Sequence, residues 1–550
     1  MYAYPTHTRT RHRRAAAPAC GGAPGQHSPA RRLPDDRYAG EPCLRAGPGF
    51  PSKALATAAL ALVLGGCTVG PNFVKPKPHV PAHWSPTALR NGREGRSRIS
   101  TREPSTVAWW SSFHDPMLTS LVRQSAAQNL NVREAVLRVR EADAQTEMLS
   151  GALWPSLSAN VSWNRQRVST NTPNGAIFGL THVFPGLPPT VVNPYNQYQI
   201  GHAASWGLDL FGGTRRAIEA ADAETRAAVY NARGVLLTMV GDVAQAYIEL
   251  RGAQLRKAIV LRTLATQRGL LRLTRDRYRA GLTSDLDVQN AATELATTRA
   301  QLPLIEQQIT VDVNQLSELM ARPPEALRSE LARARPVPPV PPVVPIGLPS
   351  DLLRRRPDIL AAQANLHAAT AQIGVAVSEF FPSVTLTAGG GYQSEGLSQL
   401  IVAASRFASF GPAINLPIFE GGRIRATVKL RRLQAKQAGI VYARTVLTAL
   451  DQVEDALAAY GADQRQRVSL RAAVRTSRNA LDLARQRYTS GISSFIDVLD
   501  AERTEEQSQL ALASATTAVS LDLVRLYQAL GGGWRAAAPA ARMAGKREGS

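Results

Sequence analysis

The chain has 550 residues, of which 44% are hydrophobic and 19% are charged, and its formal net charge is +22. This length is sufficient for a large fold of one or several domains. Residues 1–66 hold nine Lys and Arg against three acids, and the remaining positive charge is spread among Asp and Glu along helical stretches. Mixed charge of this kind is typical of a solvated helix face and argues against a nucleic-acid groove, so no nucleic-acid partner is expected.

The motifs also argue against an enzyme. The cysteines are Cys20, Cys43 and Cys67, so the body of the chain after residue 67 has neither a disulfide nor a thiolate metal site. The nine His residues show no metal-ligand spacing, and the chain has no phosphate-binding loop, nucleophile elbow or HExxH motif. We therefore expect no catalytic site, no metal and no cofactor.

Residues 1–66 are predicted to be a disordered basic extension followed by a lipoprotein signal peptide. Residues 1–50 are rich in Arg, Pro, Gly and Ala without periodicity, which indicates disorder or a translation start assigned too far upstream. Lys53 then leads into the apolar run 54–64, which is too short to span a bilayer. The segment ends in Leu64-Gly65-Gly66-Cys67, which resembles the bacterial lipobox.

The lipobox resemblance implies that the signal is cleaved before Cys67 and that its thiol carries a diacylglycerol. Thr68 follows the cysteine, whereas many lipoproteins retained in the inner membrane have Asp there, so the resemblance implies sorting to the outer membrane. Several acyl chains on one residue would anchor the protein firmly. The alternative is a chance cysteine after an export signal. Residues 67–115 are expected to form an extended, lipidated N-terminal arm.

The first repeat is predicted to span residues 116–334 and to begin with a helix. Asp115 suits the N-cap of this helix, and Pro116 suits its first position. Helical sequence continues to Ser150, with a break expected near Asn129.

Two strands are predicted after Pro155, because the hydrophobic period changes to two. Apolar side chains alternate with polar ones over residues 157–163 and again over 198–208. Each run has the length of a tilted transmembrane strand, although half-buried strands of a soluble protein show the same alternation. Periodicity alone leaves both interpretations open.

A long helix is predicted after Gly212-Gly213. No proline occurs between Thr214 and Leu302, and apolar residues recur at alternating spacings of four and three, as in a coiled-coil seam. The seam residues are Leu236, Val240, Val243, Tyr247 and Leu250. A helix continuing to Gly281 would be roughly 100 Å long at 1.5 Å per residue, which indicates a rod or tunnel wall. The chain would turn at Gly281 and return as a helix to about Met320.

The second half of the chain repeats the first. We predict a Pro-rich linker over residues 335–350, a second repeat over 351–530 and a flexible C-terminal tail over 531–550. Pro155-Ser156 matches Pro382-Ser383, and two alternating runs follow as before. The second seam consists of Val446, Leu450, Val453, Leu457 and Tyr460.

The two helical turns match each other at an offset of 210 residues. The first reads Arg277-Tyr278-Arg279-Ala280-Gly281-Leu282 and leads to Asp287-Val288, and the second reads Arg487-Tyr488-Thr489-Ser490-Gly491-Ile492 and leads to Asp497-Val498. Such a duplication gives four strands per chain. Four strands cannot close a membrane barrel, because an open edge leaves backbone groups unpaired in lipid. Three copies would supply twelve strands, so transmembrane strands would require an oligomer.

The order of these motifs resembles that of the TolC-like outer-membrane efflux channels, in particular their NodT-type lipoprotein branch. The motifs are Cys67-Thr-Val-Gly-Pro-Asn-Phe73, Trp109–Pro116, Leu352–Ile359, Phe380–Ser383 and the two turns, and the resemblance covers about residues 67–530. It implies a mixed α and β membrane protein in the cell outer membrane. The implied assembly is a homotrimer with a 12-stranded barrel, continued by a long periplasmic α-helical coiled-coil tunnel.

The resemblance also implies a function and partners. The channel would passively conduct drugs or other small molecules from an inner-membrane pump of the resistance-nodulation-division type, through a periplasmic adaptor protein, to the cell exterior. The adaptor would meet the helical tips at Gly281, Leu282, Gly491 and Ile492. Gly is needed for the tight turn regardless of such a contact.

The tips would form the periplasmic gate of the channel. The implied gate residues are Asp287, Asp497, Asp500, Tyr278, Tyr488, Arg277 and Arg487. Threefold symmetry would turn each Asp into a ring that favours cations. Helix-dipole stabilisation is the alternative for the acids, and core packing is the alternative for the tyrosines. Ser493 stands where the best-known member of the family has a basic residue, so the closing network must be built differently.

Two other functions remain open from the sequence. The same fold could serve as the outer-membrane channel of a type I protein-secretion system. A non-channel periplasmic coiled-coil lipoprotein would explain the helices, but not four alternating strands placed symmetrically.

Overall fold

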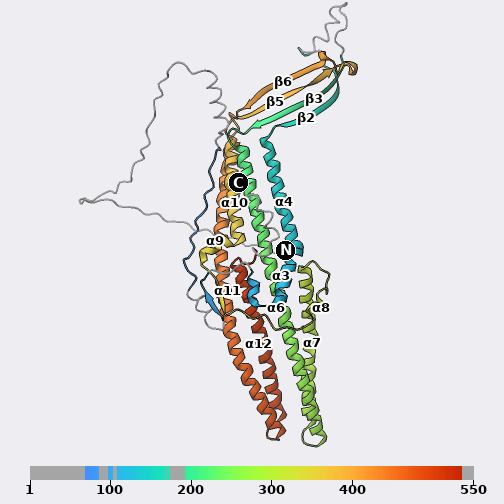
Figure 1. Ribbon diagram of the computed structural model, residues 1–550, viewed down its shortest axis with the longest axis vertical. Helices are drawn as coiled ribbons and strands as arrows, with labels where there is room; N and C mark the ends of the chain where they lie inside the picture. The colour runs from blue at the N-terminus through green and yellow to red at the C-terminus, as the bar shows by residue number, and fades with distance from the viewer. Residues whose placement is uncertain (1–67, 86–96, 103–107, 170, 174–192, 535–550) are drawn as a thin grey trace, which may run out of the picture. The chain divides into compact units, whose positions relative to one another are not determined.

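The computed structural model describes residues 68–85, 97–102, 108–169, 171–173 and 193–534 (Figure 1). The predicted basic extension, the signal peptide and Cys67 lie outside the described residues.

The first helical segment is divided as the sequence predicts. Helices α3 (Pro116–Gln128) and α4 (Leu130–Ser150) meet at Asn129. Asp115 caps α3, since its Oδ1 accepts hydrogen bonds from the backbone N–H groups of Met117 at 2.8 Å and Leu118 at 3.1 Å. The predicted N-cap is therefore confirmed.

Four strands form one antiparallel sheet in the order β2-β3-β5-β6. Their bounds are β2 (Ser156–Gln166), β3 (Tyr195–Leu208), β5 (Ser383–Ser394) and β6 (Arg406–Asn415). The alternating apolar residues share one face, and Leu157, Val161 and Phe410 on it are each at least 75% exposed. Because this apolar face is not buried in a core, the half-buried soluble strand is the wrong interpretation, and a lipid-facing surface fits.

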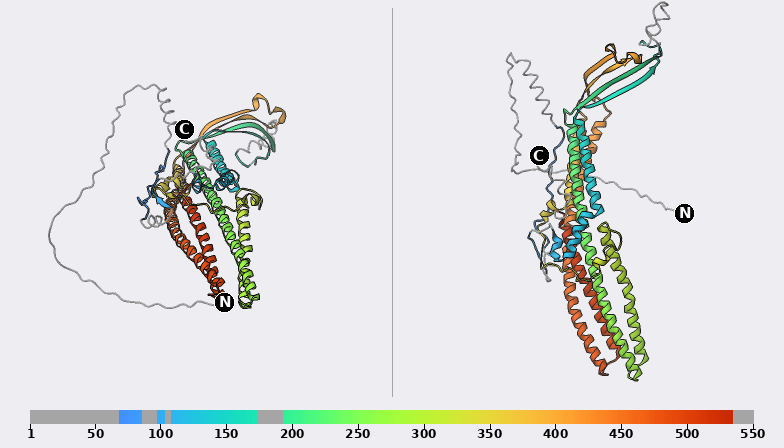
Figure 2. Two further views of the ribbon diagram at one scale, coloured as in Figure 1. Left: turned by 60° about the horizontal axis from the view of Figure 1, so that its bottom comes forward. Right: turned by 45° about the vertical axis from the view of Figure 1, so that its right-hand side comes forward.

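Two helical hairpins continue from the sheet (Figures 1 and 2). The first consists of α6 (Gly213–Arg279) and α7 (Asp285–Leu319), and the second of α11 (Arg423–Thr489) and α12 (Phe495–Ala529). Helices α6 and α11 have 67 residues each and start after left-handed glycines, Gly212 and Gly422. All ten predicted seam residues are buried or packed against the core, so both seams are confirmed.

The two halves pack unequally on their neighbours. Helix α6 packs against α4 and α7 of its own half and also against α10 (Pro357–Ser378) and α12 of the other half. Helix α11 packs mainly against α10 and α12. Among the described helices, α12 is long and apolar enough to cross a membrane, but 56% of its apolar window is buried, as expected for a core helix.

Short elements complete the fold. They are β1 (Arg98–Ser100), η1 (Trp109–Phe113), η2 (Gly151–Leu153), α8 (Arg328–Leu331), β4 (Val343–Pro345), η4 (Pro349–Asp351), α9 (Leu352–Arg355), η5 (Leu397–Gln399) and η6 (Ala403–Ser405). Trp109 of η1 stacks on Tyr527 of α12 with ring centroids 5.2 Å apart, which fastens the segment before α3 to the last long helix.

The predicted linker over residues 335–350 is not a free spacer. Strand β4 within it pairs in parallel with β1 of the N-terminal arm. Val344 and Ile346 are 0% and 1% exposed, so the linker forms part of the core. A three-residue parallel pair between distant segments leaves no local pattern that the sequence could reveal.

The predicted tail over residues 531–550 begins too early. Trp534 is only 8% exposed, and its Nε1 donates a hydrogen bond to the backbone oxygen of Arg355 at 3.1 Å. Gly531 and Gly533 have φ values of 73° and 106°, which allow the chain to fold back after α12. The Gly-rich sequence thus serves a turn that brings an aromatic anchor to the core, and residues 535–550 lie outside the described residues.

Candidate functional site at the helical tips

The two hairpin tips have the same backbone geometry. Gly281 and Gly491 have φ values of 69° and 76°, the left-handed region that favours glycine. Leu282 N–H donates to the backbone oxygen of Arg277 at 2.8 Å, and Ile492 N–H donates to that of Arg487 at 2.8 Å. These bonds close each long helix in the manner of a Schellman motif. No atom lies within 4 Å of a side chain added to either glycine, so conformation alone requires glycine here.

Each tip presents two exposed aliphatic side chains. Leu282 and Ile492, which the sequence singles out, are 66% and 68% exposed. Leu286 and Ile496, which the sequence analysis missed, occupy matching places after the turns and are 66% and 55% exposed. The offset of 210 residues could have identified them. Within the protomer each tip therefore ends in an apolar pair that faces solvent.

The predicted gate carboxylates lie at the starts of the returning helices. Asp287 accepts a hydrogen bond from the hydroxyl of Thr283. Asp497 Oδ2 accepts one from the backbone N–H of Ser494 at 3.2 Å and completes a capping box. Asp500 is exposed one turn further along α12. Asp497 therefore has a helix-capping role, whereas Asp287 binds a side chain of the turn, and within the protomer neither acid is paired with Arg277 or Arg487.

Arg277 joins the two tips of one protomer. Its Nη1 lies 3.3 Å from the backbone oxygen of Tyr488 and 3.5 Å from that of Thr489. Its guanidinium carbon lies 4.7 Å from the centre of the Tyr488 ring. A cation is favourable at this position, because the last carbonyl groups of α11 carry the negative end of the helix dipole.

The two matched tyrosines have different surroundings. Tyr488 is 3% exposed and packs on Phe495 with ring centroids 5.5 Å apart. Tyr278 is 48% exposed, and the Arg487 side chain is exposed as well. Within the described residues, the buried Tyr488 Oη and Ser493 Oγ have no hydrogen-bond partner. The structure thus brings Arg277 and Tyr488 together and leaves Tyr278 and Arg487 apart.

A layer of buried carboxylates lies behind the tips, although no sequence pattern predicts it. Glu294 of α7 and Glu502 and Glu506 of α12 are 7%, 3% and 5% exposed. Burial raises the pKa of Glu502 to about 7, against the opposing effect of Arg485. The acid-rich run 502–506 has the composition of a solvated helix face, so composition gave no signal of this burial.

A second cluster of contacts lies where the sheet meets the helices. Val69 N–H donates to the backbone oxygen of Phe211 at 3.2 Å. Arg216 donates to the oxygen of Val69 at 3.1 Å and to Asn72 Oδ1 at 2.7 Å. Phe73 stacks on His367 with ring centroids 4.4 Å apart. These contacts hold the first described residues of the arm against α6 and α10.

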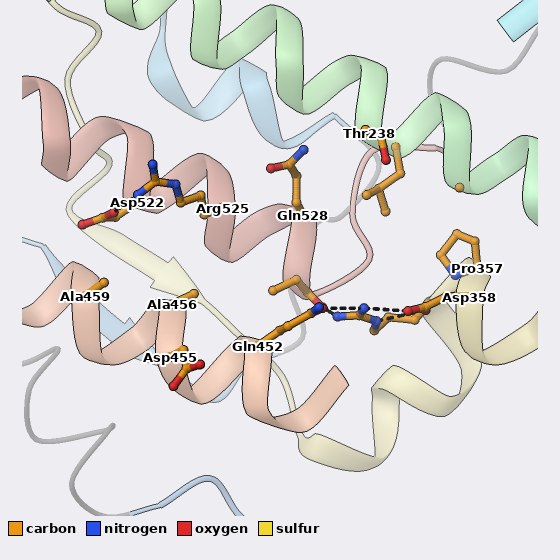
Figure 3. A pocket seen from close by; sticks show the side chains of 14 residues that line it. Thr238, Pro357, Asp358, Gln452, Asp455, Ala456, Ala459, Asp522, Arg525 and Gln528 are labelled. Atoms are coloured by element: carbon orange, nitrogen blue, oxygen red, sulfur yellow. Dashed lines mark hydrogen bonds and ion pairs between the residues drawn. The ribbon is translucent and has the colours of Figure 1, made fainter. Parts of the chain in front are cut away.

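A cavity of about 570 Å³ opens between α6, α10, α11 and α12 (Figure 3). Arg356 donates to Asp358 Oδ2, Gln452 Oε1 and the Ala529 oxygen at 2.7–2.8 Å, and these bonds tie three helices together. Burial and the nearby carboxyl of Asp463 raise the pKa of Asp522 in its wall. We interpret this region as a polar joint between helices.

Comparison with known proteins places the chain in a family. The family described as "Outer membrane efflux protein" matches residues 121–322 and again residues 348–532, which agrees with the duplication. "Nodulation protein T" of Rhizobium leguminosarum bv. viciae is 33% identical over 500 residues, covering 91% of this chain and 96% of that protein. "Toluene efflux pump outer membrane protein TtgC" of Pseudomonas putida is 32% identical over 493 residues, covering 87% of this chain and 95% of that protein.

Solved structures agree with these relatives. The outer-membrane channel OprN superimposes with a TM-score of 0.74 at 33% identity, covering 85% of this chain and 100% of that chain. The family, its outer-membrane location and the duplicated fold of four strands with two long helical hairpins agree with the sequence prediction. The chain belongs to the outer membrane efflux protein family, and it is an outer-membrane efflux channel.

Proposed function

We propose that this protein is the outer-membrane component of a tripartite efflux pump, and that it works as a homotrimer with a periplasmic adaptor and an inner-membrane pump. The name of the relative TtgC, a toluene efflux pump protein, supports the pump assignment. The exported compounds are drugs or other small molecules that pass without covalent chemistry. The trimer is supported by one observation: within a protomer, one half makes packing contacts that the matching half lacks.

The sheet of one protomer ends in two open edges. Strands β2 and β6 are the edge strands, and they run in opposite directions. Strand β6 of one copy can therefore pair in antiparallel fashion with β2 of the next. Three copies would close twelve strands and leave no unpaired backbone groups in lipid.

The long helices also differ in their packing contacts, and one of them lacks contacts that a neighbouring copy could supply. Helix α6 is covered by α10 and α12, which precede and follow the second strand pair. By the internal repeat, α11 should be covered by the α4 and α7 helices. Within one protomer, however, α4 and α7 pack against α6 and leave that face of α11 uncovered. A neighbouring copy would supply them.

Exposure along the two long helices supports this interface. Leu430 and Leu433 of α11 are 52% and 54% exposed, whereas the matching Ala220 and Ala223 of α6 are fully buried. A partner that covered α11 as α10 and α12 cover α6 would bury these side chains.

The surface around α4 that would cover α11 of a neighbouring copy also has exposed apolar side chains whose counterparts in the other half are less exposed. Leu137 of α4 is 54% exposed, and the matching Ala364 of α10 is 8% exposed. Trp154 is 74% exposed, whereas its counterpart Phe381 stacks on Phe211 with ring centroids 4.6 Å apart. The segment before α11 offers an aromatic cover, since Phe419 is 88% exposed.

Cross-linking of introduced cysteines tests this interface. We expect the pair Trp154→Cys and Phe419→Cys, treated with a bis-maleimide in the outer membrane, to give dimers and trimers. The matched control pair Phe211→Cys and Phe381→Cys should react within one chain, which consumes both thiols, adds one linker and leaves the protein monomeric. A Trp154–Phe419 pair that remains monomeric while the control pair reacts would contradict the proposed interface.

We infer that Cys67 carries the lipid anchor. The neighbouring Thr68 lies against Gly212, because a side chain on that glycine would come within 2.8 Å of the Thr68 Cα. This contact puts the arm beside the junction of β3 and α6, where acyl chains would reach the inner leaflet. Metabolic labelling with palmitate should mark the wild type and not Cys67→Ser, and equal labelling of both would refute the anchor.

We infer that the tips form a gate closed by a repeated contact. Arg277 meets the end of α11 within the protomer. By the repeat, Arg487 would meet Tyr278 at the end of α6 in the next protomer, so six contacts of one kind would close the ring. The partnerless hydroxyls of Tyr488 and Ser493 support a further surface in contact with the tips. The Asp287, Asp497 and Asp500 carboxylates would line this entrance.

The adaptor is expected to dock on the apolar pairs of the tips. The exposed Leu282, Leu286, Ile492 and Ile496 suit insertion into grooves of a helical partner. Replacing Leu282 and Ile492 by Glu should abolish co-purification with the adaptor while leaving trimers intact. Unchanged co-purification would reject this docking site.

The competing functions are less well supported. A non-channel coiled-coil lipoprotein would leave the exposed apolar sheet face without a purpose. A type I secretion channel would share the fold, and the nature of the co-purified inner-membrane transporter, a proton-driven pump or an ATPase, separates the two.

A further inference from the structure

The two hairpins of one protomer are joined behind their tips through carboxylates. Arg503 of α12 binds Glu294 of α7, with Nη2 and Oε2 2.6 Å apart. Thr298 and Gln301 of α7 donate to the carboxylate of Glu506 of α12 at 3.5 Å and 3.3 Å. The polar bonds that link α7 to α12 here therefore all depend on Glu294 or Glu506.

Glu502 lies in the same layer without comparable compensation. It is 3% exposed, and within the described residues its Oε2 has no hydrogen-bond partner. Its other oxygen lies 3.4 Å from Arg485 of α11, which is a long ion pair. A buried carboxylate with one weak partner is costly in its charged form and is accommodated more easily when it is protonated.

The charges that face Glu502 do not balance. The acids are Glu294 from α7 and Glu505 and Glu506 from α12, and the cations are Arg485 from α11 and Arg503 from α12. Helix α6 contributes the uncharged Gln267, which donates to Thr298 at 3.0 Å. With every carboxylate ionised, four acids therefore share two cations, and three of the four acids are buried.

We propose that the carboxylate layer of Glu294, Glu502 and Glu506 is a pH-sensitive joint, which holds the two hairpins of a protomer together in mildly acidic medium and loosens as the medium becomes neutral. Its effect on the gate rests on the proposed channel function, whereas the joint itself is a property of one protomer.

The direction of the pH response follows from the raised pKa of the buried glutamates. Burial raises the pKa of Glu502 to about 7, and burial also raises that of Glu506. In a separated joint water would reach these groups, and their pKa would return toward the ordinary value near 4.3. The packed joint therefore binds protons more tightly than the separated joint, so the packed state is most stable at low pH and loses stability as pH rises toward 7. For each such group, the equilibrium constant between the packed and the separated joint falls by up to about tenfold per pH unit.

Distances between spin labels at Leu282→Cys and Ile492→Cys test the proposal in the full-length protein. Labelled chains are diluted with unlabelled ones, so that only the two tips of one protomer are measured, and a chain without these cysteines gives the background. We expect a narrow tip-to-tip distribution at pH 5.5 that broadens to longer distances by pH 7.5 and changes little above. A distribution that is unchanged over this range overturns the proposal.

Three variants identify the responsible group. Glu502→Gln should keep the narrow distribution up to pH 8.5. Arg485→Met removes the cation facing Glu502 and should move the midpoint to higher pH, a shift that general destabilisation would not produce. Asp482→Asn, on the exposed face of α11, should respond like the wild type. A full pH response in Glu502→Gln, or an unshifted midpoint in Arg485→Met, would overturn the assignment.

Conductance in planar bilayers separates the two proposals. Open probability that rises together with the tip distance supports both. A pH-dependent distance in a protein that conducts nothing would sink the channel function and leave the joint standing. Conductance with pH-independent tip distances would support the channel function and overturn the pH-sensitive joint.

Discussion

Replacing Arg277 by Ala should open the channel. The side chain makes two hydrogen bonds to carbonyl oxygens at 3.3 Å and 3.5 Å and lies 4.7 Å from the Tyr488 ring. Because both bonds are long and the site is half-buried, we assign them together about 1 kcal/mol, and the cation–π contact contributes about 0.5–1 kcal/mol. The loss of about 1.5–2 kcal/mol shifts each contact roughly tenfold or more toward the separated state.

Single-channel recording of the purified protein in planar bilayers measures this shift as open probability. Arg487→Ala should have a similar effect, because we propose that it makes the equivalent contact between protomers. Arg279→Ala is the matched control, because Arg279 lies two residues along the same helix, is 76% exposed and pairs with Asp276 of its own helix. An open probability of Arg277→Ala equal to that of Arg279→Ala would refute the tip contact as a lock.

Three further outcomes are expected. Asp287→Ala and Asp497→Ala should each make the channel leaky, seen as raised conductance and as sensitivity of cells to bulky antibiotics, and wild-type behaviour of both would reject their gate role. Arg216→Met removes from α6 the charged donor that binds the arm at Val69 and Asn72, and it should increase protease cleavage of the arm by roughly tenfold or more, since such bonds contribute about 1.5–3 kcal/mol; unchanged cleavage would contradict the docking. Asp522→Asn should raise the unfolding temperature at pH 8 but not at pH 4, because the raised pKa of Asp522 means that the native state loses stability as pH rises, and an equal effect at both values would exclude that cause.

Much of the fold could be predicted because it depends on hydrophobic periodicity, helix caps and turns, each of which involves only a short stretch of sequence. The seam in α6 gives buried side chains at every position, and Asp115 caps the helix that its place before Pro116 predicts. The two glycine turns follow from the need for a left-handed residue at the end of each long helix. Such features depend on a few neighbouring residues and therefore survive in the sequence alone.

Features that depend on packing between distant segments could not be predicted in the same way. Tyr278 and Tyr488 stand in matching motifs, yet one is 48% exposed and the other 3%, because only Tyr488 packs on Phe495 and meets Arg277 within the protomer. Glu502 lies in an acid-rich run typical of a surface, yet it is 3% exposed, because it lies where the two hairpins of a protomer meet. Trp534 follows glycines that resemble the start of a flexible tail, although the chain folds back onto α9.

We propose that three copies of this chain enclose one conduit across the outer membrane. Native mass spectrometry of the detergent-purified protein, with bilayer conductance measured on the same preparation, tests it most directly. We predict a trimer that conducts ions. A stable monomer without conductance would contradict the account.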